Sequence, residues 1–275
     1  MKRVVCALAA VWLFCTASGF SSARTPGEMR RVPVLMYHSV CKTNVGEFVI
    51  SPDTLRSDFA YLKEKGYTAV FMQDIIDFCD GKADLPEKPI VLTFDDGFYN
   101  NIFYAEKIAR EYDMKMVVSV VGAYVDKERD EKKRSPVYSY VNESELAAFY
   151  KRGRAEIGNH SYDLHRTGAD GKGIRCRKGE SAEAYARRLT ADSEKCRRLI
   201  EKACGCTVNV FAYPFGCYSK ATPDILRKLG YRAVLTCKGG VNTFYKGRTD
   251  GLFSVMRYNR RGNVSTQRFF AKLPV

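Results

Sequence analysis

Two adjacent carboxylates, Asp95 and Asp96, are the clearest sign of chemistry in this sequence. They follow the apolar run 89–92 and precede Gly97, a pattern that predicts a buried strand with a glycine turning the backbone behind it. Parallel α/β folds carry their chemistry at this end of their strands. Because neighbouring carboxylates repel, such a pair is tolerated mainly when a cation binds one and the other moves protons. A surface Asp-Gly turn is the alternative.

The three histidines of the chain also fall at the ends of predicted strands. His38 follows the apolar segment 33–37, His160 follows the segment 155–158, and His165 lies in the loop after it. In a parallel α/β fold these positions converge on the rim that carries the two aspartates. A lone histidine is more often structural, but three at one rim favour a site over a surface turn.

The spacing of His160 and His165 excludes a helix as their carrier. Five residues rotate about 500° on an α-helix, which leaves the two side chains roughly 140° apart. A strand end followed by a turn can aim both at one ion. Together with one carboxylate they form a set typical of zinc sites, and cobalt, nickel or iron would also fit. The metal would acidify a bound water, whose proton the second carboxylate could accept.

Short apolar segments alternate with amphipathic ones along the chain. The predicted strands are 33–37, 68–71, 90–94, 115–121, 155–158, 208–213, 233–237 and 254–258. Helices are predicted from Ser51 to Gly66, from Asn142 to about Gly153, over 181–203, and from Thr222 to Gly230. Repeated strand–helix units predict a parallel sheet, and about eight of them predict a closed or nearly closed barrel. A doubly wound open sheet is the alternative fold.

The beginning of the chain has the pattern of a secretory signal. Lys2 and Arg3 precede an uncharged stretch over residues 4–15, and small residues follow up to Ala23. This predicts a signal peptide over residues 1–23, because the stretch is too short to span a bilayer comfortably. An uncleaved membrane anchor is the alternative. We therefore expect an exported protein, secreted or associated with the cell envelope, with one catalytic domain over residues 32–275.

The chain is basic, with a net charge of +14. Loss of Lys2 and Arg3 with the signal lowers this charge by two to +12. A basic exported protein suits an anionic cell envelope or an acidic polymer. Charge alone would also suit a nucleic acid, but we expect neither a nucleic acid nor a stable protein partner. Eight cysteines lie beyond the signal, and we treat them as structural without predicting their pairing.

Three segments of the sequence together resemble the polysaccharide deacetylases, also called carbohydrate esterase family four or the NodB-homology fold. They are 93–97 (TFDDG), 157–165 (IGNHSYDLH) and 211–216 (FAYPFG). The resemblance runs from about residue 32 to at least residue 242. It implies a distorted barrel of about seven or eight β/α units and metal-dependent removal of N-acetyl groups from an amino-sugar polymer. The polymer could be poly-N-acetylglucosamine, peptidoglycan or a chitin-like oligomer.

The same resemblance implies a role for each matching residue. Asp95 corresponds to the general base of the family. The ligands of one divalent metal ion, with zinc as the first expectation, correspond to Asp96, His160 and His165.

Two positions depart from the usual family pattern. Ala212 stands where an arginine orients the base, and Cys237 stands in the region that usually supplies the acid histidine. The branch similar to poly-N-acetylglucosamine deacetylases instead has an early Val-Leu-x-Tyr-His motif, which here ends in His38. That resemblance implies that His38 is the general acid. A buried structural histidine is the alternative for His38. For the protein as a whole, the alternative is a catalytically silent binding protein for an envelope polysaccharide that uses the same groove.

The remaining predicted contacts concern the acetyl oxygen and the sugar. A backbone N–H in the turn that contains Tyr213 and Phe215 would bind the oxyanion, and Phe215 is favoured because Pro214 has no N–H. Asn242 is a predicted sugar contact. Arg257 could replace the missing arginine beside Asp95, and an ordinary surface salt bridge is an equal alternative for it.

Overall fold

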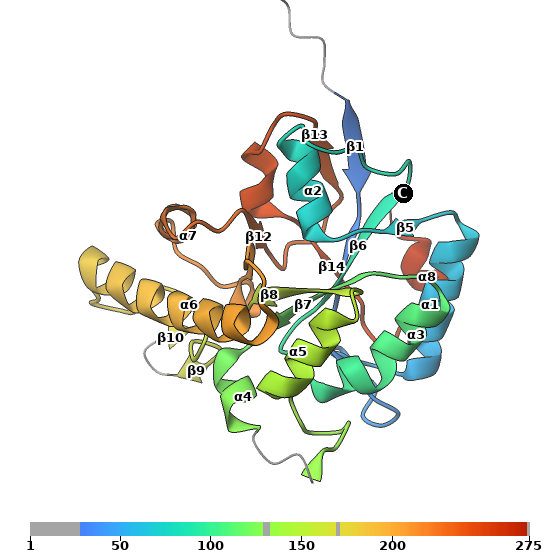
Figure 1. The fold of residues 1–275 in the computed structure, drawn as a ribbon, viewed down its shortest axis with the longest axis horizontal. Helices are drawn as coiled ribbons and strands as arrows, with labels where there is room; N and C mark the ends of the chain where they lie inside the picture. Colours follow the sequence, from blue (N-terminus) through green and yellow to red (C-terminus); the bar gives the residue numbers. More distant parts are fainter. Residues whose placement is uncertain (1–27, 129–132, 169–170, 274–275) are drawn as a thin grey trace, which may run out of the picture.

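The computed structural model describes residues 28–128, 133–168 and 171–273 (Figure 1). The signal predicted over residues 1–23 lies outside the described residues. Within the described ranges, no helix combines the length and the apolar character needed to cross a bilayer.

One parallel sheet organises the molecule, in the order β12-β11-β8-β7-β6-β2-β14, with β5 also paired to β6. Its strands are β2 Val34–Tyr37, β5 Thr68–Ala69, β6 Pro89–Phe94, β7 Met116–Val120, β8 Ala155–Asn159, β11 Val210–Ala212, β12 Ala233–Leu235 and β14 Tyr258–Asn259. All eight were predicted from the sequence, but β14 shares only Tyr258 with its predicted range of 254–258. The reason is that residues 250–254 form a 3₁₀-helix, η4, which delays the strand.

The chain between η4 and β14 links the two edges of this sheet. Val255 bridges Leu235 in parallel, and its backbone N–H donates to the Val234 carbonyl at 3.0 Å. Three residues later the same chain enters β14, which pairs with β2 at the opposite edge. The sheet is therefore curled into a distorted barrel, as predicted, rather than open and doubly wound.

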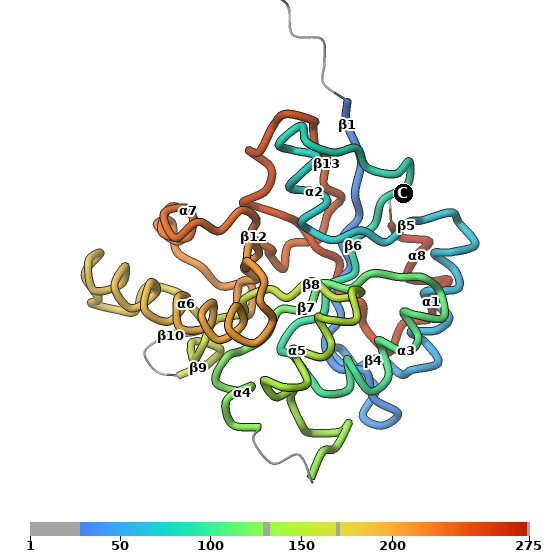
Figure 2. The backbone as a smooth tube through the Cα atoms, viewed as in Figure 1, coloured from blue at the N-terminus to red at the C-terminus, as the bar shows by residue number. Residues whose placement is uncertain are grey.

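Helices surround the curled sheet, as Figures 1 and 2 show. They are α1 Pro52–Glu64, α2 Met72–Cys79, α3 Glu106–Glu111, α4 Gly122–Lys127, α5 Glu143–Lys151, α6 Ala182–Cys204, α7 Thr222–Lys228 and α8 Thr266–Phe270, with the π-helix η1 Asn101–Ala105 before α3. The predicted caps form: Ser51 accepts the Thr54 N–H at 3.0 Å, and Asn142 accepts the Glu145 N–H at 2.9 Å.

The described residues also form three two-stranded sheets outside the main sheet. β1 Met29–Val32 pairs antiparallel with β13 Asn242–Tyr245, and β3 Ser39–Val40 pairs in parallel with β4 Val49–Ile50. The third pair is the hairpin of β9 Thr167–Gly168 and β10 Gly171–Lys172, which follows directly on the segment that carries His160 and His165.

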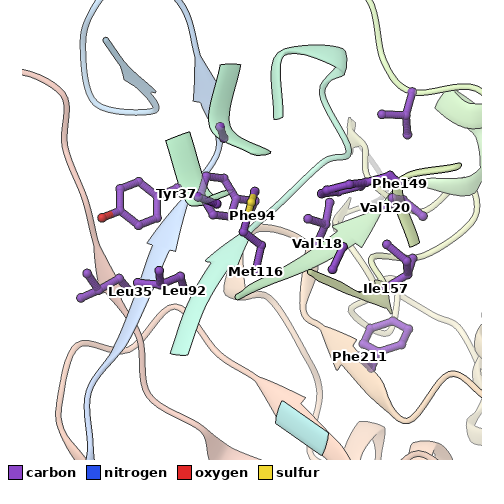
Figure 3. Close-up of a cluster of buried hydrophobic side chains, with 14 of the residues drawn as sticks. Leu35, Tyr37, Leu92, Phe94, Met116, Val118, Val120, Phe149, Ile157 and Phe211 are labelled. Atoms are coloured by element: carbon purple, nitrogen blue, oxygen red, sulfur yellow. The ribbon is translucent and has the colours of Figure 1, made fainter. Parts of the chain in front are cut away.

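Packing in the core places the ends of β2 and β6 level with each other. Tyr37 and Phe94, the last residues of the two strands, are paired in register, and their buried rings stack with centroids 4.9 Å apart (Figure 3). Burial of an aromatic side chain of this size contributes about 1.5–3 kcal/mol. Because the strands end together, His38 and Asp95 leave the sheet side by side, and the Asp95 N–H donates to the Tyr37 carbonyl at 3.0 Å.

Candidate active site

A cavity of about 520 Å³ lies at the C-terminal ends of the strands. Its lining includes all five side chains for which the sequence predicted chemistry: His38, Asp95, Asp96, His160 and His165. They follow the ends of β2, β6 and β8; β2 and β6 are neighbours in the sheet, and β7 separates β6 from β8. Convergence on one rim is therefore a consequence of parallel pairing and of the shared strand ends.

Asp95 is held by Arg257 inside the barrel. Both side chains are fully buried, and the guanidinium donates to the two carboxylate oxygens at 2.8 Å each. Burial opposes ionisation of Asp95, but the charge and hydrogen bonds of Arg257, together with the nearby His160 and His38, outweigh it and hold the pKa of Asp95 well below its usual range. The bidentate pair fixes the carboxylate in orientation, yet each oxygen keeps a lone pair for a water proton. The surface salt bridge considered for Arg257 is thus wrong.

The surroundings of Asp96 shift its pKa in the opposite direction from that of Asp95. Burial, together with the negative charge of Asp95, raises the pKa of Asp96 to about 7. Its Oδ1 atom is buried and has no hydrogen-bond partner among the described residues. A carboxylate in this position lacks a positive partner, which a bound cation would supply.

The two histidines of the loop after β8 supply the remaining donor atoms. The Nε2 atoms of His160 and His165 lie 3.6 and 3.3 Å from Asp96 Oδ1. Burial lowers the pKa of His160 to about 3, which keeps its imidazole neutral. Its Nδ1–H donates to the Ala212 carbonyl at 2.9 Å, so the Nε2 lone pair points away from that bond. This set of one oxygen and two nitrogens fits a divalent metal ion.

Hydrogen bonds from buried side chains hold the His160–His165 loop. Asn159 Oδ1 accepts the Ser161 N–H at 2.8 Å, which turns the chain directly after His160. The two carboxylate oxygens of Asp192, on α6, accept the N–H groups of Tyr162 and Asp163 at 2.8 Å each. The longest of the described helices thereby anchors the loop on which both histidines lie.

Backbone strain is concentrated around the cavity. Five described residues other than glycine have a positive φ, and Asp96, Ser161 and Phe215 are three of them, at 72°, 70° and 57°. Gly97 also has a positive φ, and a Cβ there would lie 2.9 Å from the Val120 side chain. Conformations of this kind cost roughly 1–3 kcal/mol each for residues other than glycine and cluster at functional sites.

His38 directly follows β2 and lines the same cavity as the proposed base and ligands. Its Nδ1 atom is buried without a hydrogen-bond partner among the described residues, and its ring meets Phe48 edge-on at 4.9 Å. Burial lowers the pKa of His38, while the nearby Asp95 carboxylate acts in the opposite direction. The imidazole is therefore free to act on a molecule in the cavity.

The mouth of the cavity is aromatic and basic. Phe48 and Phe215 line it with half-exposed rings, at 52% and 37% exposure, and the Lys172 ammonium lies 4.9 Å from the Phe215 ring centroid. Exposed aromatic faces of this kind bind sugar rings well. The sequence prediction missed Phe48 and Lys172, because loop residues carry no periodic pattern.

Two other predicted contacts do not reach the cavity. The Asn242 side chain is buried in β13, where it donates to the Val32 and Met256 carbonyls and accepts the Met256 N–H. The Tyr213 ring is buried and stacks on Tyr218 at 4.5 Å. Neither side chain lines the cavity, so the expectation that Asn242 contacts sugar directly does not fit its position.

Comparisons with known proteins agree with this geometry. A family model described as polysaccharide deacetylase matches residues 82–234, a range that contains both aspartates and both loop histidines. The poly-beta-1,6-N-acetyl-D-glucosamine N-deacetylase of Escherichia coli (strain K12) is 27% identical over 215 residues, which cover 70% of this chain and 31% of that protein. This chain thus spans about a third of the length of that curated relative.

Solved structures share the fold. A de-N-acetylase from Aggregatibacter actinomycetemcomitans superposes with a TM-score of 0.73 at 24% identity, covering 86% of this chain and 97% of that one. The deacetylase domain of BpsB from Bordetella bronchiseptica gives a TM-score of 0.67 at 25% identity, covering 82% and 94%.

Proposed function

Because this chain belongs to the polysaccharide deacetylase family, we propose that it hydrolyses N-acetyl groups of an amino-sugar polymer and releases acetate. The observation that carries the proposal is the convergence of His38, Asp95, Asp96, His160 and His165 on one cavity. The name of the Escherichia coli relative makes poly-N-acetylglucosamine the first polymer to test, and peptidoglycan the second.

We propose Asp96, His160 and His165 as the ligands of one divalent ion. When bound, that ion supplies Lewis-acid polarisation of the acetyl oxygen and acidification of water. The Oδ1 of Asp96, buried and without a hydrogen-bond partner in the described part of the chain, and the fixed tautomer of His160 support this ligand set.

In this proposal, three residues of the chain transfer protons or stabilise the negative charge that develops on the acetyl oxygen. Asp95, oriented by Arg257, accepts the proton of the attacking water. The backbone N–H of Phe215 stabilises the oxyanion, because at the start of the 3₁₀-helix Pro214–Gly216 this N–H has no partner within the helix. His38, in its protonated form, gives a proton to the leaving sugar amine.

The first prediction concerns metal content. The purified protein is expected to hold one divalent ion per chain, because Asp96, His160 and His165 offer converging donor atoms. His160→Ala and His165→Ala should each lose most of the metal, since removal of one of three ligands leaves an incomplete site. His38→Ala is the matched control and should keep it. Elemental analysis that finds full occupancy in both ligand variants would contradict the assignment.

The second prediction separates an enzyme from a silent polymer-binding protein on the same fold. Acetylated glucosamine oligomers incubated with the metal-loaded protein should release acetate, and a chelator should stop the release. Re-addition of zinc, cobalt, nickel or iron in turn identifies the ions that restore it. Oligomer binding without acetate release under any of these ions would favour the binding protein.

Export is a separate proposal, based on the charge and apolar pattern of residues 1–23. A cleaved signal would leave a mature protein in the envelope or the medium, where a basic surface suits anionic polymers. N-terminal sequencing of the protein from cell fractions tests this. A chain that starts at Met1 in the soluble interior of the cell would argue against it.

A further inference from the structure

A second cavity, of about 440 Å³, is lined by two of the chain segments that also line the active-site cavity. The two share the β9–β10 hairpin: Gly171 and Gly173 line the second cavity, and Lys172 between them lines the first. They also share the loop after β8, because Asp163 and Leu164 line the second cavity and His165 lines the first. A polymer that extends from the active site along this hairpin would therefore meet the second cavity.

The walls of the second cavity are rich in arginine. Among the described residues, four guanidinium groups line it, against two carboxylates; these charged residues are Arg166, Arg175, Arg177, Arg188, Asp163 and Asp192. The positive charge lies next to a catalytic cavity on a chain whose net charge is +14.

The acidic groups of this cavity already have partners. Asp163 forms an ion pair with Arg166, and Asp192 accepts two backbone N–H groups of the loop after β8. Arg188 donates to both carboxylate oxygens of Glu180 at 2.6 and 2.7 Å. These contacts satisfy two of the four guanidinium groups.

Arg175 and Arg177 are exposed side chains that also line the cavity. Within the described ranges, no hydrogen bond, ion pair or ring contact engages either guanidinium, and Glu180, already paired with Arg188, acts on the Arg177 guanidinium only through its charge. A guanidinium presents a planar fork of donors that matches carboxylate and phosphate groups, and two of them in one concavity select for an anion. An ordinary solvated face would carry such arginines without a cavity between them.

We propose that this cavity is a subsite for an anionic substituent of the polymer, a carboxylate or a phosphate, carried on a sugar unit next to the one that is deacetylated. The inference deepens the proposed function and rests on it. Arg175 and Arg177 bind the substituent, and the β9–β10 hairpin sets its spacing from the reacting acetyl group.

The test compares neutral and anionic oligomers of equal length. One is an N-acetylglucosamine oligomer, the second alternates with a carboxylate-bearing amino sugar, and the third carries a phosphate ester. Arg175→Gln/Arg177→Gln should raise KM for an anionic oligomer roughly tenfold, with kcat unchanged and the neutral oligomer affected less than twofold. Lys178→Gln, a charge change in the same loop outside the cavity wall, is the matched control and should change no KM.

Salt and direct binding provide independent readouts. Added salt should weaken binding of the anionic oligomer to the wild type and have much less effect on the double variant. Binding to the Asp95→Asn variant, measured by fluorescence anisotropy of labelled oligomers, needs no turnover, so it decides about the subsite even if no acetate is released. A preference for the carboxylate or the phosphate oligomer that the double variant loses supports the subsite and identifies the group. Equal affinity for neutral and anionic oligomers, or an equal loss in Lys178→Gln, would overturn it.

Discussion

Asp95→Asn is expected to lower turnover on acetylated glucosamine oligomers by about 10²–10⁴-fold while the metal stays bound. The amide is nearly isosteric with the carboxylate but cannot accept the proton of water. Metal retention is expected because Asp96, not Asp95, lies beside the two histidine nitrogens. Steady-state kinetics and elemental analysis of the same preparation measure both effects.

The same substitution should also destabilise the fold. Asp95→Asn leaves the buried guanidinium of Arg257 without its counter-charge, and breaking a buried pair by removing one partner costs about 3–5 kcal/mol. The double variant Asp95→Asn/Arg257→Met removes both charges and should recover most of the free energy of unfolding, measured in urea, but none of the turnover. Stability and catalysis can thus be separated at one position.

Two outcomes would change this assignment. If Asp95→Asn lost its metal while Asp96→Asn kept it, the roles of base and ligand would have to be exchanged. If the double variant recovered turnover along with stability, Asp95 would act through the fold and not as a base.

The elements that carry the site could be predicted because apolar runs and their ends are local properties of the chain. His38 and Asp95 each follow a short buried strand, and the parallel register of β2 and β6 brings these strand ends together. The spacing of His160 and His165 likewise excluded a helix from the sequence alone. Local pattern was sufficient wherever a functional residue lies directly after a strand.

Contacts between distant segments were not predictable in the same way. The partner of Asp95 is Arg257, which is 162 residues away, and the sequence offered this pairing only as an equal alternative to a surface salt bridge. Its burial depends on how the chain before β14 crosses the barrel, and no periodicity in residues 254–258 encodes that path. For Asn242 the sequence predicted a contact that the structure does not show. Its loop-like sequence suggested a place on the rim, but β13 pairs with β1 and the Asn242 side chain is hydrogen-bonded to the backbone.

His38→Ala is expected to lower turnover on acetylated oligomers by about 10²–10⁴-fold, with metal content and thermal melting near wild type. The expectation follows from position: His38 lines the cavity, its Nδ1 has no partner among the described residues, and the other two histidines are proposed as metal ligands. Cys237, in the region where the usual family pattern has the acid histidine, has a thiol whose pKa is raised by burial and is a poor source of a rapidly transferred proton.

The leaving group distinguishes acid catalysis from packing. In an acetyl ester of an activated phenol, the phenolate leaves without taking up a proton. His38→Ala should therefore lose much less activity on such an ester than on the amide. Burial lowers the pKa of His38, and only its protonated form can donate, so wild-type amide turnover should fall as pH rises through that lowered pKa. The ester, and the His38→Ala variant on either substrate, should lack this decline. Equal losses on amide and ester, together with a lowered melting temperature, would assign His38 to packing against Phe48 rather than to proton transfer.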